Sequence, residues 1–213
     1  MQAPANTVII KLEKKFYDSV TFQSGQTIHF DPSWNPEEYT MLRAEVVSIP
    51  KSVTQRQDYS GYEIAIKPGD EVLVRYDVVF SYKDQPDRDS PIYKNLIFKY
   101  NELTGRNEEL WLCDIQKIFG VINGNQVNMI NGYVMLEPIT EKLANFSSLI
   151  IRPDNQKTSQ LKHKAIVKHI NSKTLPVKSG DTVYINPNMV MCYEINLQKF
   201  YIIKESYLLA IAT

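Results

Sequence analysis

Apolar and polar residues alternate in short runs along most of this chain. A period of two is typical of a half-buried β-strand, whose side chains point in turn to the core and to solvent. Pro and Gly separate the runs, as in Lys67-Pro68-Gly69-Asp70, and mark turns. Only Asp114–Val121 and Lys204–Ile211 could form helices, and both are short. The sequence therefore predicts an all-β protein, with strands at Val8–Leu12, Glu45–Ile49, Val72–Tyr76, Leu96–Tyr100 and Glu109–Cys113.

An internal repeat divides the chain into two similar halves. Ile66–Val72 and Val177–Val183 both carry a Gly-Asp pair and lie 111 residues apart. Glycine supplies the backbone freedom that a tight turn before a strand requires. Three further pairs of segments keep the same order: Ile28–Pro32 with Leu149–Pro153, Arg43–Ile49 with Lys164–Ile170, and Leu110–Val121 with Phe200–Ile211. We therefore expect two domains, residues 1–122 and 123–213, joined at the polar stretch Asn123–Gln126.

Charge and cysteine content indicate how the protein makes contacts and in which compartment it works. The net charge is zero, but residues 1–122 carry 14 Lys+Arg against 18 Asp+Glu, and residues 123–213 carry 10 against 6. This asymmetry suits head-to-tail contacts between neighbouring subunits, or reflects two solvated surfaces that diverged. Cys113 and Cys192 are too few for a disulfide scaffold, and no signal peptide or membrane-spanning run is visible. We expect a cytoplasmic protein without membrane contact.

The second copy resembles a GroES-like co-chaperonin subunit, the lid of a group I chaperonin. The resemblance rests on an opening strand, a V-K-x-G-D-x-V element and an E-S-x-x-L-A-I ending, found at Tyr133–Pro138, Val177–Val183 and Glu205–Ile211. The first copy is similar through Lys67–Asp70, and the tandem arrangement resembles the double-domain co-chaperonin of plastids. The resemblance implies two tandem GroES-like small β-barrels, the first with a roof-type hairpin and an inserted charged loop at Ser81–Lys94, the second with a shortened roof.

The resemblance also implies how such a protein would act. In the family, a mobile loop carries an aliphatic triplet that docks on the chaperonin, and Leu149, Ile150 and Ile151 occupy that position here. The first copy has Ile28 and Phe30 at the matching place, followed by Trp34 as a contact anchor on a loop. The family's last strand pairs with the first strand of a neighbouring subunit and closes a ring. Here this implies that Leu208–Ile211 pairs with Val8–Leu12 of a homo-oligomer, or that the equivalent strands pair across the tandem.

A second hypothesis is a structural assembly protein that uses the same fold, such as a phage capsid decoration or connector protein in a virion. The first copy has His29 inside the triplet, and the loop after it contains Pro32, Trp34 and Pro36, which favour a stiff loop. Rigid loops buried against another chain are typical of a structural component. Both hypotheses describe a protein that binds other proteins and is not an enzyme.

No motif for catalysis, metal binding or cofactor binding is present. His29, His163 and His169 are interpreted as structural, and Asp84, Asp87 and Asp89 lack the glycine and glutamate of a calcium-binding EF-hand loop. Six lysines between Asn155 and Gly180, with no acid among them, could form a nucleic-acid face. The pI of 6.8 and the absence of aromatic residues between them in sequence argue against this face. We therefore expect no catalytic residue, no metal, no cofactor and no nucleic-acid partner.

Overall fold

A computed structural model of the chain describes residues 1–14, 19–21, 24–29, 42–51, 66–79, 95–124, 126–142, 158–172, 175–195 and 198–212. Regular structure in these residues consists of β-strands and three-residue 3-10 turns, which confirms the all-β prediction. The chain forms two compact units, a first unit of Met1–Asn131 and a second unit of Gly132–Thr213. The division therefore falls after Asn131, later than the expected boundary at residue 122.

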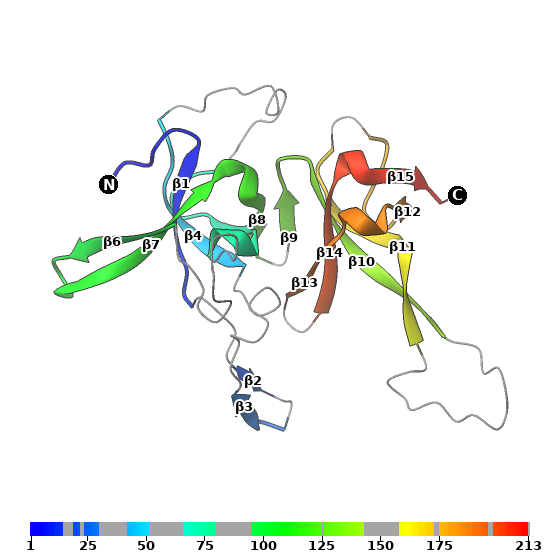
Figure 1. Cartoon of the computed structure of the whole chain (residues 1–213), viewed down its shortest axis with the longest axis horizontal. Helices are drawn as coiled ribbons and strands as arrows, with labels where there is room; N and C mark the ends of the chain where they lie inside the picture. The colour runs from blue at the N-terminus through cyan, green and yellow to red at the C-terminus, as the bar shows by residue number, and fades with distance from the viewer. Residues whose placement is uncertain are drawn as a thin grey trace, which may run out of the picture. The chain divides into compact units, whose positions relative to one another are not determined.

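The first unit is built on a seven-stranded antiparallel sheet (Figure 1). Its strands, in spatial order, are β6 (Leu96–Asn101), β7 (Arg106–Asp114), β1 (Thr7–Lys11), β4 (Arg43–Ser48), β5 (Glu71–Val74), β8 (Ile118–Asn123) and β9 (Gln126–Met129). A separate two-stranded hairpin joins β2 (Ser19–Thr21) to β3 (Thr27–His29).

The second unit contains a six-stranded antiparallel sheet in the order β13, β14, β10, β11, β12, β15. The bounds of these strands are Met191–Ile195, Gln198–Lys204, Tyr133–Lys142, Thr158–Ile170, Thr182–Ile185 and Leu208–Ile211. This order repeats that of β6, β7, β1, β4, β5 and β8. Neither sheet closes on itself within the described residues, so closed GroES-like barrels stay a prediction.

The two segments that could have been helical are also alike. Each contains a 3-10 turn, η4 (Ile115–Lys117) in the first unit and η7 (Glu205–Tyr207) in the second, and each continues as a strand. Two further 3-10 turns, η3 (Tyr76–Val78) and η6 (Pro187–Met189), follow β5 and β12 in corresponding places.

Strand register repeats as closely as strand order. Ile10 pairs with Val46 on one side and Trp111 on the other, and Leu136 pairs with Val167 and Tyr201 in the same way. A register shift directly precedes both positions, between Ile9 and Ile10 and between Met135 and Leu136. Because register decides which face each side chain occupies, equal registers put corresponding residues on the same face of both sheets.

The Gly-Asp turn predicted from sequence is the same in both units. In the first, the Gly69 amide donates to the Val46 carbonyl and the Val46 amide donates to the Asp70 carbonyl, both at 2.8 Å. The Asp70 side chain closes the turn by accepting from the Lys67 amide at 2.9 Å. Gly69 has a φ of 88°, a conformation that favours glycine.

The second unit repeats each of these bonds. The Gly180 amide donates to the Val167 carbonyl and the Val167 amide donates to the Asp181 carbonyl, both at 2.8 Å. The Asp181 carboxylate accepts from the Lys178 amide at 2.8 Å, and Gly180 has a φ of 95°.

The two cores occupy matching positions. The core of the second unit consists of Val134, Leu136, Ala165, Val167, Val183, Ile185, Tyr201 and Ile203. The same register positions in the first unit are filled by core residues, namely Val8, Ile10, Ala44, Val46, Val72, Val74, Trp111 and Cys113. Trp111 is 1% exposed, so it lies fully inside this core. Four of these eight matched pairs are identical and the other four are both apolar or aromatic, so the two units share the pattern of burial as well as the topology.

Candidate functional site

The outer edge of strand β15 is the clearest uncovered apolar feature in the described part of the second unit. β15 pairs with β12 through Val183–Ile211 and Tyr184–Ala210, and it is the last strand of its sheet. Leu209 on β15 is 67% exposed and Ile211 is 38% exposed. An edge strand of this kind offers unpaired backbone groups and apolar side chains to another strand.

The corresponding strand of the first unit is covered. β8 has the position of β15, but β9 pairs along its outer edge through Gly120–Met129, Val121–Asn128 and Ile122–Val127. All five residues from Ile118 to Ile122 are buried. The contrast between β8 and β15 is that, among the described residues, no strand pairs along the outer edge of β15.

Gly120 allows β9 to approach closely. A Cβ atom at this position would lie 2.8 Å from the carbonyl oxygen of Asn128 and 2.8 Å from Cγ1 of Val127. Backbone atoms of β9 cannot give way as the end of a flexible side chain can. The glycine is therefore required by the neighbouring strand.

Gly120→Ala is expected to lower the free energy of unfolding by about 1–3 kcal/mol, because the added methyl group forces β9 away from β8. Urea unfolding followed by circular dichroism would measure the change. Val127→Ala alone is the control for the removal of one β9 side chain, and adding it to Gly120→Ala should restore little, since the clash with the Asn128 carbonyl remains. A Gly120→Ala variant as stable as the wild type would contradict this account.

The structure corrects the expected partner of the last strand. Val8–Leu12 was expected to accept Leu208–Ile211 of a neighbouring subunit, but β1 lies between β7 and β4. Both edges of β1 are already paired, so its backbone has no free edge for an additional strand. Within the chain, the segment that pairs with β8 is β9, which precedes the first strand of the second unit and is not that strand itself.

Most predicted partner-binding residues lie outside the described residues. Leu149, Ile150, Ile151, Phe30 and Trp34 belong to this group. Ile28 lies on β3, opposite Val20 of β2, and is 49% exposed. Of the predicted partner-binding residues, the structure therefore places only Ile28 among those it describes, exposed on a paired hairpin.

Sequence reasoning missed a second exposed apolar surface, on the β6–β7 hairpin. Phe98 and Tyr100 are separated by one residue on the edge strand β6 and are both more than half exposed, and Leu103 at the tip is almost fully exposed. Phe98 pairs with Glu109 and Tyr100 with Asn107 of β7. The strand was predicted, but exposure of its apolar face depends on how far the hairpin extends beyond the core.

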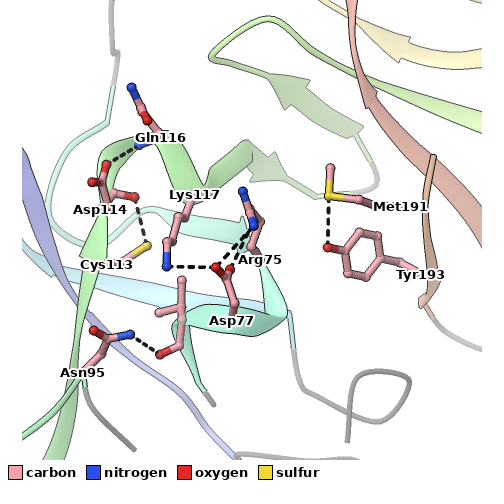
Figure 2. Close-up of polar contacts among 10 residues, drawn as sticks. Arg75, Asp77, Asn95, Cys113, Asp114, Gln116, Lys117, Met191 and Tyr193 are labelled. Carbon is pink, nitrogen blue, oxygen red and sulfur yellow. Dashed lines mark hydrogen bonds and ion pairs between the residues drawn. The ribbon is translucent and has the colours of Figure 1, made fainter. Parts of the chain in front are cut away.

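A charged cluster joins the two 3-10 turns of the first unit (Figure 2). Asp77 of η3 contacts Arg75 Nε at 3.1 Å and Lys117 Nζ at 2.9 Å. The Arg75 amide also donates to the Lys117 carbonyl at 2.9 Å. These contacts tie η3 to η4 through one carboxylate that bridges two cations, so we assign the cluster a structural role.

Of the two cysteines, Cys113 is buried and Cys192 is exposed. Burial raises the pKa of the Cys113 thiol well above its usual range, so the thiol stays protonated. Its Sγ lies 3.4 Å from the carbonyl oxygen of Asp114 (Figure 2). Within the described ranges, no group of three or more His, Cys, Asp or Glu side chains could hold a metal ion.

Two further findings concern membrane spans and similarity to known proteins. In the part of the chain that the structure describes, no helix has the length and apolar character to cross a membrane. No protein-family model and no curated protein matches the sequence.

Proposed function

We propose that this chain is a non-enzymatic, co-chaperonin-like assembly protein that joins copies of itself through the outer edge of β15. The observation that carries this proposal is the difference between β15, which has exposed Leu209 and Ile211, and β8, whose corresponding edge is paired with β9. A strand from another copy would satisfy the backbone of β15 and cover both side chains. When the partner strand is not another β15, such a contact uses different surfaces on the two copies, and repeated contacts generate a ring if the rotation closes.

The GroES-like part of the proposal rests on the sequence resemblance and on the shared topology. Equal strand order, equal registers and the same Gly-Asp turn support the interpretation of both units as versions of one domain. In a co-chaperonin, Leu149, Ile150 and Ile151 would bind a group I chaperonin in the cytoplasm. A loop that becomes ordered on binding gives modest affinity at each site, which a ring multiplies.

A structural assembly protein, such as a virion component, is the alternative. It is favoured by the β2–β3 hairpin, which places Ile28, the first residue of the first triplet, on a paired strand. The Oγ1 atoms of Thr21 and Thr27 add a cross-strand contact of 2.9 Å in this hairpin. A paired hairpin is suited to a fixed contact surface, whereas a chaperonin-binding loop works by ordering on contact.

Mass photometry and light scattering of the purified protein would test self-assembly. The wild type should form an oligomer, and the Leu209→Asp/Ile211→Asp variant should be a 24.6 kDa monomer, because two carboxylates on the edge prevent strand pairing. Leu103→Asp is the matched control, since it places a charge on an apolar residue that is also exposed but lies on the β6–β7 hairpin. A monomeric wild type, or a Leu209→Asp/Ile211→Asp variant that still forms the oligomer, would contradict the proposal.

A second set of measurements distinguishes the two kinds of assembly protein. Mixing the oligomer with a group I chaperonin and ATP should yield a complex that Ile150→Asp abolishes without changing the oligomer. An oligomer that never binds the chaperonin would leave the structural alternative.

A further inference from the structure

The outer face of the second sheet carries a lysine without the acidic partner that its counterpart has. Lys164 of β11 pairs with Tyr184 of β12, as Arg43 of β4 pairs with Leu73 of β5. In the first unit, Arg43 lies 3.4 Å from the carboxylate of Glu71. The position of Glu71 is taken by Thr182 in the second unit, directly before Val183 in the same register. Lys164 therefore has no carboxylate where Arg43 has one.

Aromatic rings lie beside this lysine. The Nζ atom of Lys164 is 4.7 Å from the centroid of the Tyr184 ring. The His163 ring stacks on the same tyrosine, with centroids 6.4 Å apart and planes inclined by 22°. His163 and Lys162 are both exposed. No Phe, Tyr or Trp lies between these lysines in sequence, but the neighbouring strand β12 places Tyr184 beside Lys164.

The cations of this face have few acids to neutralise them. Within the described ranges, neither Lys162 nor Lys164 has a carboxylate at ion-pair distance. Glu137, on the adjacent strand β10, is 3.4 Å from Lys168. Asp181 accepts a hydrogen bond from the Lys178 amide and is used by the Gly-Asp turn. Residues 132–213 as a whole carry ten Lys+Arg and six Asp+Glu.

We propose that the surface formed by Lys162, His163, Lys164 and Tyr184 binds single-stranded nucleic acid. Lysines pair with phosphates, and flat rings accept unpaired bases by stacking, which is the combination that single strands use on proteins. The Lys164 ammonium can turn from the Tyr184 ring to a phosphate and leave the ring face to a base. An acidic protein segment would need the lysines alone, so the His163–Tyr184 pair favours nucleic acid.

Fluorescence anisotropy with a labelled oligo(dT) of about 20 nucleotides tests the proposal on the intact chain. Affinity should fall steeply with salt, and Lys162→Ala/Lys164→Ala should reduce the slope of log affinity against log salt by about 1.4, because each of the two lysines that pairs with a phosphate contributes about 0.7. Tyr184→Leu should weaken binding about tenfold, and Tyr184→Phe should retain it, because stacking needs the ring and not the hydroxyl.

The variants have internal controls. Leucine is compatible with the backbone at position 184, because Leu73 occupies the same register position in the first unit. Arg43→Ala removes the corresponding cation from the first unit and should leave oligo(dT) affinity unchanged. Circular dichroism verifies that each variant is folded.

Two results would overturn the proposal. One is the absence of binding at low salt, or binding that Lys162→Ala/Lys164→Ala and Tyr184→Leu leave intact. The other is competition by poly-glutamate as effective as that by unlabelled oligo(dT), together with full binding by Tyr184→Leu. The second result would assign the face to an acidic protein partner.

Discussion

Replacing Trp111 by alanine is expected to lower the free energy of unfolding of the first unit by about 3–5 kcal/mol. Trp111 is among the largest fully buried side chains of the described residues, and it packs in the core with Val8, Ile10 and Val46. Its removal leaves a cavity in this core, beneath β7, which is paired with β6 and β1. Because domains are stable by only about 5–15 kcal/mol, the decrease is a large fraction of the total. Urea unfolding followed by circular dichroism would measure it.

The second unit supplies the control for this substitution. Tyr201 holds the same register position in its own sheet, so Trp111→Tyr introduces a residue that this backbone site accepts elsewhere in the chain. We expect Trp111→Tyr to cost about 1–2 kcal/mol. A Trp111→Ala variant whose free energy of unfolding lies within about 1 kcal/mol of the wild-type value would show that the core collapses around the gap.

Replacing Asn131 by alanine is expected to destabilise the first unit by about 2–4 kcal/mol. Asn131 is buried, and its Nδ2 donates to the carbonyl of Ile115 at 2.8 Å and to the carbonyl of Ile118 at 2.9 Å. Its φ is 56°, a left-handed conformation that asparagine tolerates better than alanine. The variant therefore lacks two buried hydrogen bonds and has a strained backbone.

Asn131→Gly separates the two effects. Glycine adopts a φ of 56° without strain, so this variant lacks only the hydrogen bonds and should be more stable than Asn131→Ala by about 1 kcal/mol. Thermal and urea unfolding of both variants would measure the difference. Equal stability of the two variants would contradict a role for backbone strain at this position.

Local signals predicted much of the fold. Strands such as Val72–Val74 were visible because a short run of apolar, mostly β-branched residues after a turn is typical of a buried strand. The repeated turns were visible because Gly69 and Gly180 adopt a conformation that few other residues accept. Trp111 could be assigned to the core from its place on an apolar strand.

Features that depend on strand neighbours could not be predicted in the same way. The domain boundary was expected at Asn123–Gln126, yet the chain continues there from β8 into β9 (Gln126–Met129), which pairs with β8. The interior position of β1, which excludes Val8–Leu12 as a partner for β15, follows from the order of the sheet. Pairing between distant segments is a property of the assembled sheet, and propensity alone does not determine it.

The two candidate binding surfaces, at β15 and around Tyr184, also depend on strand neighbours and could not be predicted from local sequence. Leu209 is exposed because no strand in the described part of the chain lies along the outer edge of β15, and the sequence of β15 itself does not show this. Tyr184 comes to lie beside Lys164 through cross-strand register, although the two residues are 20 positions apart in sequence (184 − 164). The aliphatic triplet at Leu149, Ile150 and Ile151 stays a prediction.

Gly120 and Ala210 differ in size in a way that matches whether a neighbouring strand is present beside them in the described part of the chain. The two residues hold the same place in β8 and β15, next to Leu73 and Tyr184 respectively. A methyl group is excluded at the first site by the carbonyl oxygen of Asn128, only 2.8 Å from where it would lie, and is present at the second. A strand that joins β15 must therefore follow a wider path than β9 does. Such a contact is looser than the internal one, and subunits joined in this way can separate and exchange while each chain keeps its own fold.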